Sequence, residues 1–223
     1  MINDSIRDNL PLRKEKHKIM EEWEDLRDKL CGLDEAGRGP LAGPVAAGAV
    51  ILGLDFPLDI LGDSKKLTEK ARNEALKVIF SQAKAWGIGW VWPQEIDRIN
   101  ILQGSLLAMK KAWEDLVRNF PEYQDFQNCP LGVADGLFCP ELPFRVIPLV
   151  KADSRVPAVS AASIIAKVAR DRWMERYSWV DDRYGFEIHK GYPTVRHREA
   201  LKVHGLSEIH RKTFKWKDPH QDL

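Results

Sequence analysis

Two adjacent acidic residues and a glycine-rich turn form the stretch of this sequence best suited to chemistry. Asp34 and Glu35 follow a short apolar run and precede Gly37-Arg38-Gly39. Because acidic residues are depleted in strands and costly to bury, a pair of them at a strand end needs a cation, a hydrogen-bond donor or solvent. The two glycines let the main chain approach a ligand closely, and the planar guanidinium between them suits phosphate. This stretch therefore predicts a metal ion and a phosphate group side by side.

The same glycines allow a different interpretation. The run from Gly37 to Ala42 fits the dinucleotide-binding pattern G-x-G-x-x-G/A, and Asp55 lies downstream where a ribose ligand is expected. That pattern requires a helix to open at its glycines, whereas Pro40 and then the strand-like residues 45–52 follow here. A dinucleotide site, or an acidic turn that binds nothing, stays an alternative at this point.

Two further acids lie at or near the ends of predicted strands. Asp135 closes the apolar run 131–135, and Asp153 follows the strand predicted over 144–150. Either aspartate taken alone is typical of a turn or a helix cap. Ser64 and Lys65 precede a helix that Thr68 can cap, so they could hold a phosphate at a helix N-terminus or lie in a solvated turn.

The hydrophobic pattern predicts the elements that must position these residues. Strands are predicted over 45–52 and 88–92, and the short turn before the first of them favours an antiparallel hairpin. Apolar residues at helical spacing predict a lead helix over 14–29 and a helix that runs on from Gln94. The helix that begins near 156 is rich in small residues, so it can lie close against a sheet behind Asp153. A last helix is predicted near 194–204.

Composition and charge narrow the class of protein. The chain has 223 residues with 44% hydrophobic content, which is enough for one substantial core. Three cysteines without a C-x-x-C pair fit a reducing compartment, so we expect a cytoplasmic location. The weakly polar run 41–54 is shorter than the roughly 20 residues that span a bilayer, and the N-terminal residues lack the apolar core of a signal peptide. We expect neither a membrane span nor export.

The basic residues are unevenly distributed. The formal net charge is +1, but residues 183–217 hold nine Lys and Arg against three acids, a balance of +6. This balance predicts a surface that follows a nucleic-acid backbone, or simply a solvated basic face. Five of the six histidines lie in the last 35 residues at a spacing that matches no zinc template.

Several motifs taken together resemble the ribonuclease HII family over roughly residues 30–215. They are Asp34-Glu35-Ala36-Gly37-Arg38-Gly39-Pro40, Asp63-Ser64-Lys65-Lys66-Leu67, Ala134-Asp135-Gly136, Lys151-Ala152-Asp153, the small-residue run 160–171 and His189-Lys190-Gly191-Tyr192-Pro193-Thr194. The resemblance implies an α/β fold of the ribonuclease-H-like kind, with a five-stranded mixed sheet flanked by helices and a C-terminal helical segment. It divides the chain into a lead over 1–30, a catalytic domain over 31–180 and a substrate-binding segment over 181–223.

The activity that the resemblance implies is endonucleolytic. The family cleaves 5′ of a ribonucleotide in RNA·DNA hybrids and in duplex DNA with embedded ribonucleotides, leaving 3′-hydroxyl and 5′-phosphate ends. The resemblance assigns metal binding and catalysis to Asp34, Glu35, Asp135 and Asp153, and substrate binding to Gly37, Arg38, Gly39, Ser64, Lys65, Lys190 and Tyr192. Oxygen-only ligands favour two Mg²⁺ or Mn²⁺ ions over zinc. A monomer is expected; a dinucleotide enzyme and a non-catalytic nucleic-acid-binding module are the alternatives.

Overall fold

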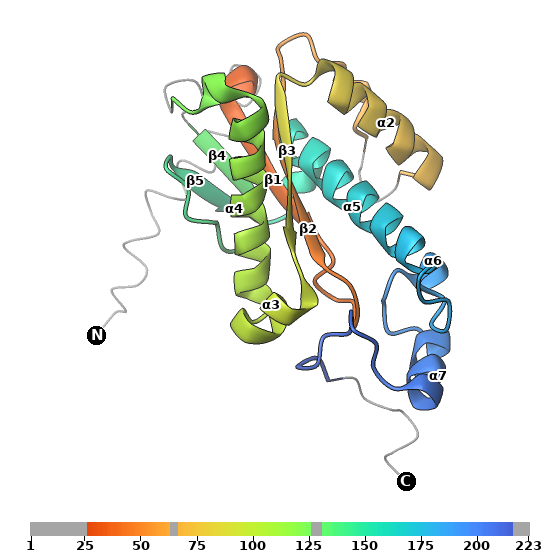
Figure 1. Cartoon of the computed structure of the whole chain (residues 1–223). Helices are drawn as coiled ribbons and strands as arrows, with labels where there is room; N and C mark the ends of the chain where they lie inside the picture. The colour runs from red at the N-terminus through yellow and green to blue at the C-terminus, as the bar shows by residue number, and fades with distance from the viewer. Residues whose placement is uncertain (1–25, 63–66, 126–130, 216–223) are drawn as a thin grey trace, which may run out of the picture.

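The computed structural model describes residues 26–62, 67–125 and 131–215, and its centre is one mixed five-stranded sheet (Figure 1). The strands are β1 (Leu30–Ala36), β2 (Val45–Ile51), β3 (Ala85–Val91), β4 (Leu131–Asp135) and β5 (Val146–Leu149). Their order is β3-β2-β1-β4-β5. The first three strands pair antiparallel, while β4 runs parallel to β1 and β5 parallel to β4. The predicted five-stranded mixed sheet and its β1–β2 hairpin are confirmed.

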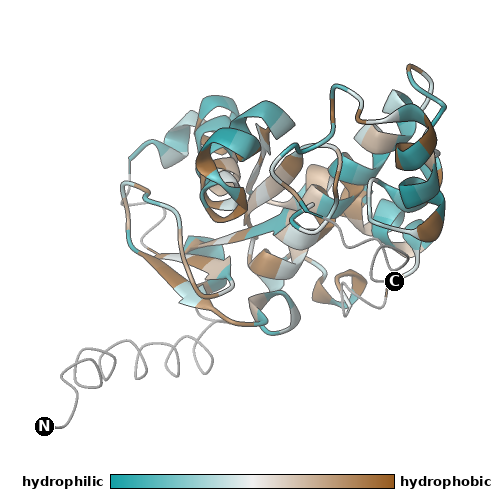
Figure 2. Ribbon diagram, turned by 90° about the horizontal axis from the view of Figure 1, so that it is seen from below, coloured by the Kyte–Doolittle hydropathy of each residue, from teal (hydrophilic) through white to brown (hydrophobic). Residues whose placement is uncertain are grey.

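Helices cover both faces of this sheet. They are α2 (Glu69–Gln82), α3 (Pro93–Ile99), α4 (Ile101–Asn119), α5 (Pro157–Tyr177), α6 (Phe186–His189) and α7 (Val195–His204). Helix α4 packs on one face, and α2 and α5 pack on the other, so the sheet separates two hydrophobic cores. Figure 2 shows hydrophobic residues gathered between the helices and the sheet, with mostly hydrophilic outer turns. No helix in the described ranges is long and apolar enough to cross a membrane.

Helix α5 lies almost in contact with the backbone of the sheet. A Cβ atom added to Gly32 would stand 2.1 Å from the carbonyl carbon of Ala158, and one added to Gly48 would stand 2.4 Å from the carbonyl oxygen of Ala162. Only glycine on the strands and small residues on the helix permit this approach. The close packing predicted from the small-residue run is confirmed, and it brings α5 directly behind β1.

The predicted continuous helix from Gln94 is wrong, because the chain breaks at Asn100. This residue has a φ of 70° and separates α3 from α4. Its side chain accepts hydrogen bonds from the backbone N–H groups of Leu102 and Gln103, so it caps α4. Helical spacing runs on across the break, which is why periodicity alone does not detect it. The caps Thr68 and Thr194 are found as the sequence indicates.

The structure describes little of the predicted N-terminal lead helix, but it describes the C-terminal segment up to residue 215. The predicted lead helix lies mostly outside the described residues, and its last part, Arg27–Lys29, is a short 3-10 turn. The C-terminal segment folds back onto the turn after β1, where Ala42 forms an isolated β-bridge with His210. A small apolar cluster that includes Leu41, Met174 and Phe186 seals this contact. The C-terminal segment thereby packs against one side of the turn after β1.

Candidate active site

Four acidic residues lie at one edge of the sheet. Asp34 and Glu35 are near the end of β1, and Asp135 is the last residue of the parallel strand β4. Asp153 lies in the short 3-10 turn that follows β5. The backbone N–H of Ala152 donates a hydrogen bond of 2.8 Å to the Asp135 carboxylate, which joins that turn to the end of β4. Parallel strands end at a common edge, and this topology brings Asp135 close enough to Asp34 and Glu35 for its charge to act on both. Asp153 lines a separate small cavity with Leu61 and Gly62.

The surroundings of Asp34 and Glu35 raise their pKa values and so disfavour the charged form of both carboxylates. Asp34 is only 6% exposed, and its burial raises its pKa well above the usual range. The charges of Glu35 and then Asp135 raise the pKa further, against a hydrogen bond from Ser163 that lowers it. Burial also raises the pKa of Glu35, against the opposing charge of Arg38. The edge therefore concentrates negative charge that a cation would relieve.

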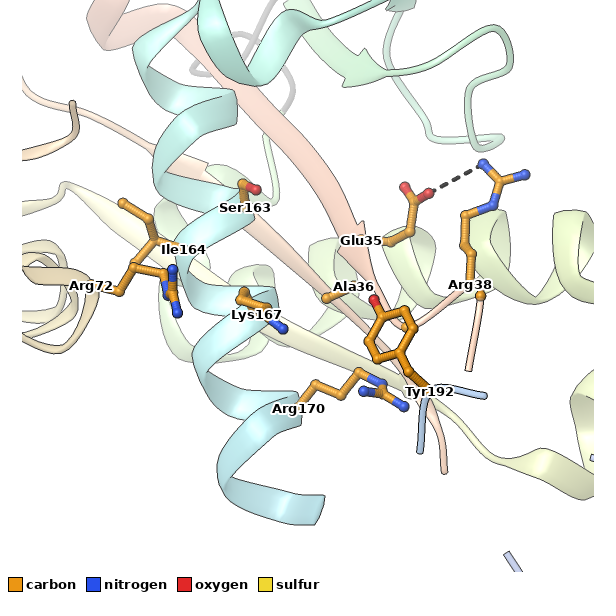
Figure 3. A pocket seen from close by; sticks show the side chains of 11 residues that line it. Glu35, Ala36, Arg38, Arg72, Ser163, Ile164, Lys167, Arg170 and Tyr192 are labelled. Atoms are coloured by element: carbon orange, nitrogen blue, oxygen red, sulfur yellow. Dashed lines mark hydrogen bonds and ion pairs between the residues drawn. The ribbon is translucent and has the colours of Figure 1, made fainter. Parts of the chain in front are cut away.

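The chemistry of these donors fits a hard divalent cation, although the side chains do not already form a ligand shell. Carboxylate oxygens are the ligands of Mg²⁺ and Mn²⁺. Among the described residues, no three His, Cys, Asp or Glu side chains are grouped so as to hold a metal ion. The Glu35 carboxylate instead accepts a hydrogen bond of 3.3 Å from Arg38 (Figure 3). This contact engages Oε1 of Glu35.

A cleft of about 410 Å³ opens beside the β1 carboxylates. Cationic side chains line it from three parts of the chain: Arg38 after β1, Arg72 on α2, and Lys167 and Arg170 on α5 (Figure 3). Among the described residues that line it, Glu35 is the one acid. Arg170 is buried with its guanidinium bound to backbone carbonyls, and Lys167 pairs with Asp171 at 2.9 Å. The positive charge offered to a phosphate backbone near Glu35 therefore comes mainly from Arg38 and Arg72.

Tyr192 stands at the mouth of this cleft with 41% of its surface exposed. Its ring centroid lies 5.9 Å from the ammonium of Lys167, and a Cβ on Gly39 would lie 3.5 Å from the ring. Figure 3 shows the ring between α5 and the turn after β1. The structure thus brings Tyr192, with its ring partly exposed, together with the predicted turn Gly37-Arg38-Gly39.

The structure does not bring Lys190, another predicted substrate residue, into the cleft. The Lys190 ammonium forms an ion pair of 2.8 Å with Glu175 and donates to the carbonyl of Glu187, and Lys190 does not line the cleft. Ser64 and Lys65 lie outside the described residues, so their predicted phosphate contact stays a prediction.

The comparisons with known proteins identify the family of this chain. The family profile described as ribonuclease HII matches residues 31–217. The chain belongs to the ribonuclease HII family. A ribonuclease HII from Treponema denticola is 51% identical over 192 residues, which cover 83% of this chain and 97% of that protein. Membership in this family makes the chain a ribonuclease H endonuclease.

Solved structures of ribonucleases H share the fold of this family member. Ribonuclease H2 from Pyrococcus horikoshii superposes with a TM-score of 0.63 at 26% identity and covers 83% of this chain and 93% of its own. The ribonuclease HII in the PCNA:RNase HII complex from Archaeoglobus fulgidus gives 0.61 at 28% identity over 85% and 96%. Bst-RNase HIII in complex with Mn²⁺, at 17% identity and 0.61 over 81% and 72%, shares the fold.

Four residues that line the cleft were not predicted from the sequence to bind substrate: Arg72, Ser163, Lys167 and Arg170. The last three lie on α5 at steps of four and three, which places them on one helix face. This polar stripe begins within the small and apolar first half of the helix, which was a usable signal. Arg72 gave no such signal, because its approach depends on how α2 packs on α5.

Proposed function

We propose that this chain cleaves the phosphodiester on the 5′ side of a ribonucleotide, in RNA·DNA hybrids and in duplex DNA with embedded ribonucleotides. The observation that carries the proposal is the cleft lined by cationic side chains and by Glu35, which adjoins the buried Asp34 on β1. A phosphate backbone drawn into this cleft is delivered to the carboxylates, and 3′-hydroxyl and 5′-phosphate ends result. Residues 31–180 form the catalytic part, residues 181–223 the substrate-binding segment, and the protein acts as a monomer.

Asp34, Glu35, Asp135 and Asp153 would hold two Mg²⁺ or Mn²⁺ ions. Bound ions of this kind supply activation of the attacking water and stabilisation of the leaving oxygen. Ser163 lowers the pKa of Asp34 as a hydrogen-bond donor, and the Ala152 N–H donates a hydrogen bond to Asp135. Mn²⁺ in Bst-RNase HIII agrees with this donor chemistry on a shared fold.

The cleft residues bind and orient the substrate. Arg38, Arg72 and Lys167 attract the phosphates that flank the scissile bond. The main chain of Gly37-Arg38-Gly39 contacts the 2′-hydroxyl, the group that distinguishes RNA from DNA. Tyr192 stacks on the next sugar on the 3′ side, where a second 2′-hydroxyl would crowd the ring. These contacts together select a ribonucleotide followed by a deoxyribonucleotide.

A DNA duplex with one embedded ribonucleotide tests this function. The wild-type chain is incubated with it in Mg²⁺, in Mn²⁺ or in chelator, and the products are sized and their ends identified. We expect one cut 5′ of the ribonucleotide in either metal and none in chelator. Asp135→Asn should be inactive, while Asp182→Asn, at an exposed position on the C-terminal segment, should cut normally.

Two other results would favour the alternatives. Binding of the duplex without cleavage in any metal would indicate a non-catalytic nucleic-acid-binding module. Saturable binding of NAD(H) that Arg38→Ala abolishes would indicate a dinucleotide enzyme.

A further inference from the structure

Arg211 is a buried arginine whose side chain binds the main chain of a distant turn. The residue is 2% exposed. Its three guanidinium nitrogens donate five hydrogen bonds of 2.6–3.0 Å to backbone carbonyls, and the acceptors are Gly37, Arg38, Pro40 and Gly43. The side chain thus crosses from the C-terminal segment into the turn that follows β1, 168 to 174 positions earlier in the chain.

This contact is more specific than ordinary packing. Burying a cation is costly unless its donors are satisfied, and here neutral carbonyl groups satisfy them. Burial, followed by the charge of Arg170, lowers the pKa of Arg211 to about 9, so the side chain is still a cation at neutral pH. The planar guanidinium donates hydrogen bonds only in fixed directions. Arg211 therefore determines how the peptide groups of the turn are oriented.

The orientation of those peptides decides what the turn offers to a ligand. In a trans peptide the carbonyl and the N–H of the next residue point in opposite directions. The Gly37 and Arg38 carbonyls point to the guanidinium, so the N–H groups of Arg38 and Gly39 point away from it. Both residues line the cleft. The inward hydrogen bonds to Arg211 thus leave two outward donors for a ligand.

The same segment also holds the tyrosine. The Arg211 N–H donates to the Leu41 carbonyl at 2.8 Å, and the Leu41 N–H donates to the Gly191 carbonyl at 2.8 Å. Tyr192 follows directly. A second buried arginine, Arg170, reinforces this junction by donating to the carbonyls of Ala42, Pro44 and Lys190. The glycine turn and the tyrosine are therefore fixed relative to each other through carbonyl contacts.

We propose that Arg211 is a positioning residue for recognition of the ribonucleotide, because it holds the turn of residues 37–43 with the Arg38 and Gly39 N–H groups facing the 2′-hydroxyl. The inference rests on the proposed function. In this proposal Arg211 does not contact the substrate and acts only through the carbonyls of the turn. Removal of the guanidinium should relax the turn and weaken discrimination between RNA and DNA, leaving general duplex binding in place.

The test compares two duplexes that differ by one 2′-hydroxyl. Affinity is measured in chelator for a DNA duplex with one ribonucleotide and for the all-DNA duplex of the same sequence. In the wild type the first should bind more tightly. Arg211→Lys keeps a cation but lacks the fork, and it should reduce the ratio of the two affinities by about tenfold, the value of one hydrogen bond to a polar ligand group. Affinity for all-DNA duplex should change less than about twofold.

A matched control separates positioning from a general decrease in stability. Leu201→Ala truncates a buried side chain of the same C-terminal cluster, one that cannot hydrogen-bond to the carbonyls of residues 37–43, and it should destabilise the fold while leaving the ratio unchanged. Hydrogen exchange gives a second measurement: in Arg211→Lys and Arg211→Met, exchange should accelerate across residues 37–43 and not across β2 and β3. If the Lys variant does not fold, the Met variant is used in the same assays.

The outcomes distinguish the two ideas. A wild type that cuts the ribonucleotide duplex, together with an Arg211→Lys variant of unchanged affinity ratio, overturns the positioning role alone. Unchanged exchange over residues 37–43 overturns it as well. A wild type that neither prefers nor cuts the ribonucleotide duplex overturns the proposed function, and recognition by this turn falls with it.

Discussion

Lowering the pH from 7 to 5 should destabilise this protein through a pair of buried histidines. His197 and His210 share a hydrogen bond of 3.0 Å between their Nε2 atoms. The Nδ1 of His210 accepts from the Ser207 N–H, so its Nε2 carries the proton and donates to His197. The Nδ1–H of His197 then donates to the Tyr192 carbonyl at 2.9 Å. A proton added to either ring would face a donor, so both rings are held neutral.

The size of the effect follows from the two pKa values. Burial, and for His210 the charge of His197, lowers each pKa from 6.5 to about 4. The unfolded chain therefore binds more protons between these values, and stability is present above pH 6.5 and decreases as the pH falls towards 4. Between pH 7 and pH 5 each imidazole should remove about 2 kcal/mol from the free energy of unfolding, and the pair up to about 4 kcal/mol.

Urea unfolding at pH 7 and pH 5 measures this decrease. The wild type is compared with the double variant His197→Gln, His210→Gln, whose lower overall stability does not matter because only the change with pH is read. Asp34 and Glu35, with raised pKa values, act in the opposite direction and are common to both proteins. The exposed His204→Gln serves as control. An equal loss of free energy in the wild type and the double variant between the two pH values would show that these histidines do not cause the pH dependence.

Three further predictions concern the active site and its basic surface. Asp34→Asn should abolish cleavage, yet raise or preserve the melting temperature of the metal-free protein at neutral pH. A buried carboxylate whose pKa is raised contributes less folding free energy as the pH rises through that pKa, so removing it should not destabilise the fold. A lower melting temperature for the variant would contradict this. Tyr192→Ala should lower cleavage at a single ribonucleotide by about 10- to 100-fold, as expected when a stacking interaction is removed, with Tyr192→Phe close to wild type. Normal cleavage by folded Tyr192→Ala would leave the tyrosine only a packing role. Neutralising Arg196, Lys202 and Lys215 should reduce the log–log salt slope of duplex binding by about 0.9 for each phosphate that the variant no longer binds, and an unchanged slope would show a merely solvated face.

Local sequence determined most of the elements and the identity of the main functional residues. The apolar runs before Asp34 and Asp135 predict strands with carboxylates at or near their ends. The carboxylates of β1 lie near its end, and β4 ends at Asp135. Thr68 and Thr194 cap their helices as their positions indicate. The small residues of α5 predict its close approach to the sheet. Each of these features depends on side-chain type and spacing within a few residues, so it can be read along the chain.

Tertiary structure alone decided how these parts meet. The approach of Ser163 to Asp34, and of Arg72 to the cleft, depends on how helices pack on the sheet. The break at Asn100 depends on the turn that joins two helices with continuous spacing. The hydrogen bonds from Arg211 to the turn after β1 leave no signal in the sequence, because their acceptors are backbone carbonyls. Every residue carries a carbonyl, and only the folded chain selects which of them an arginine will bind.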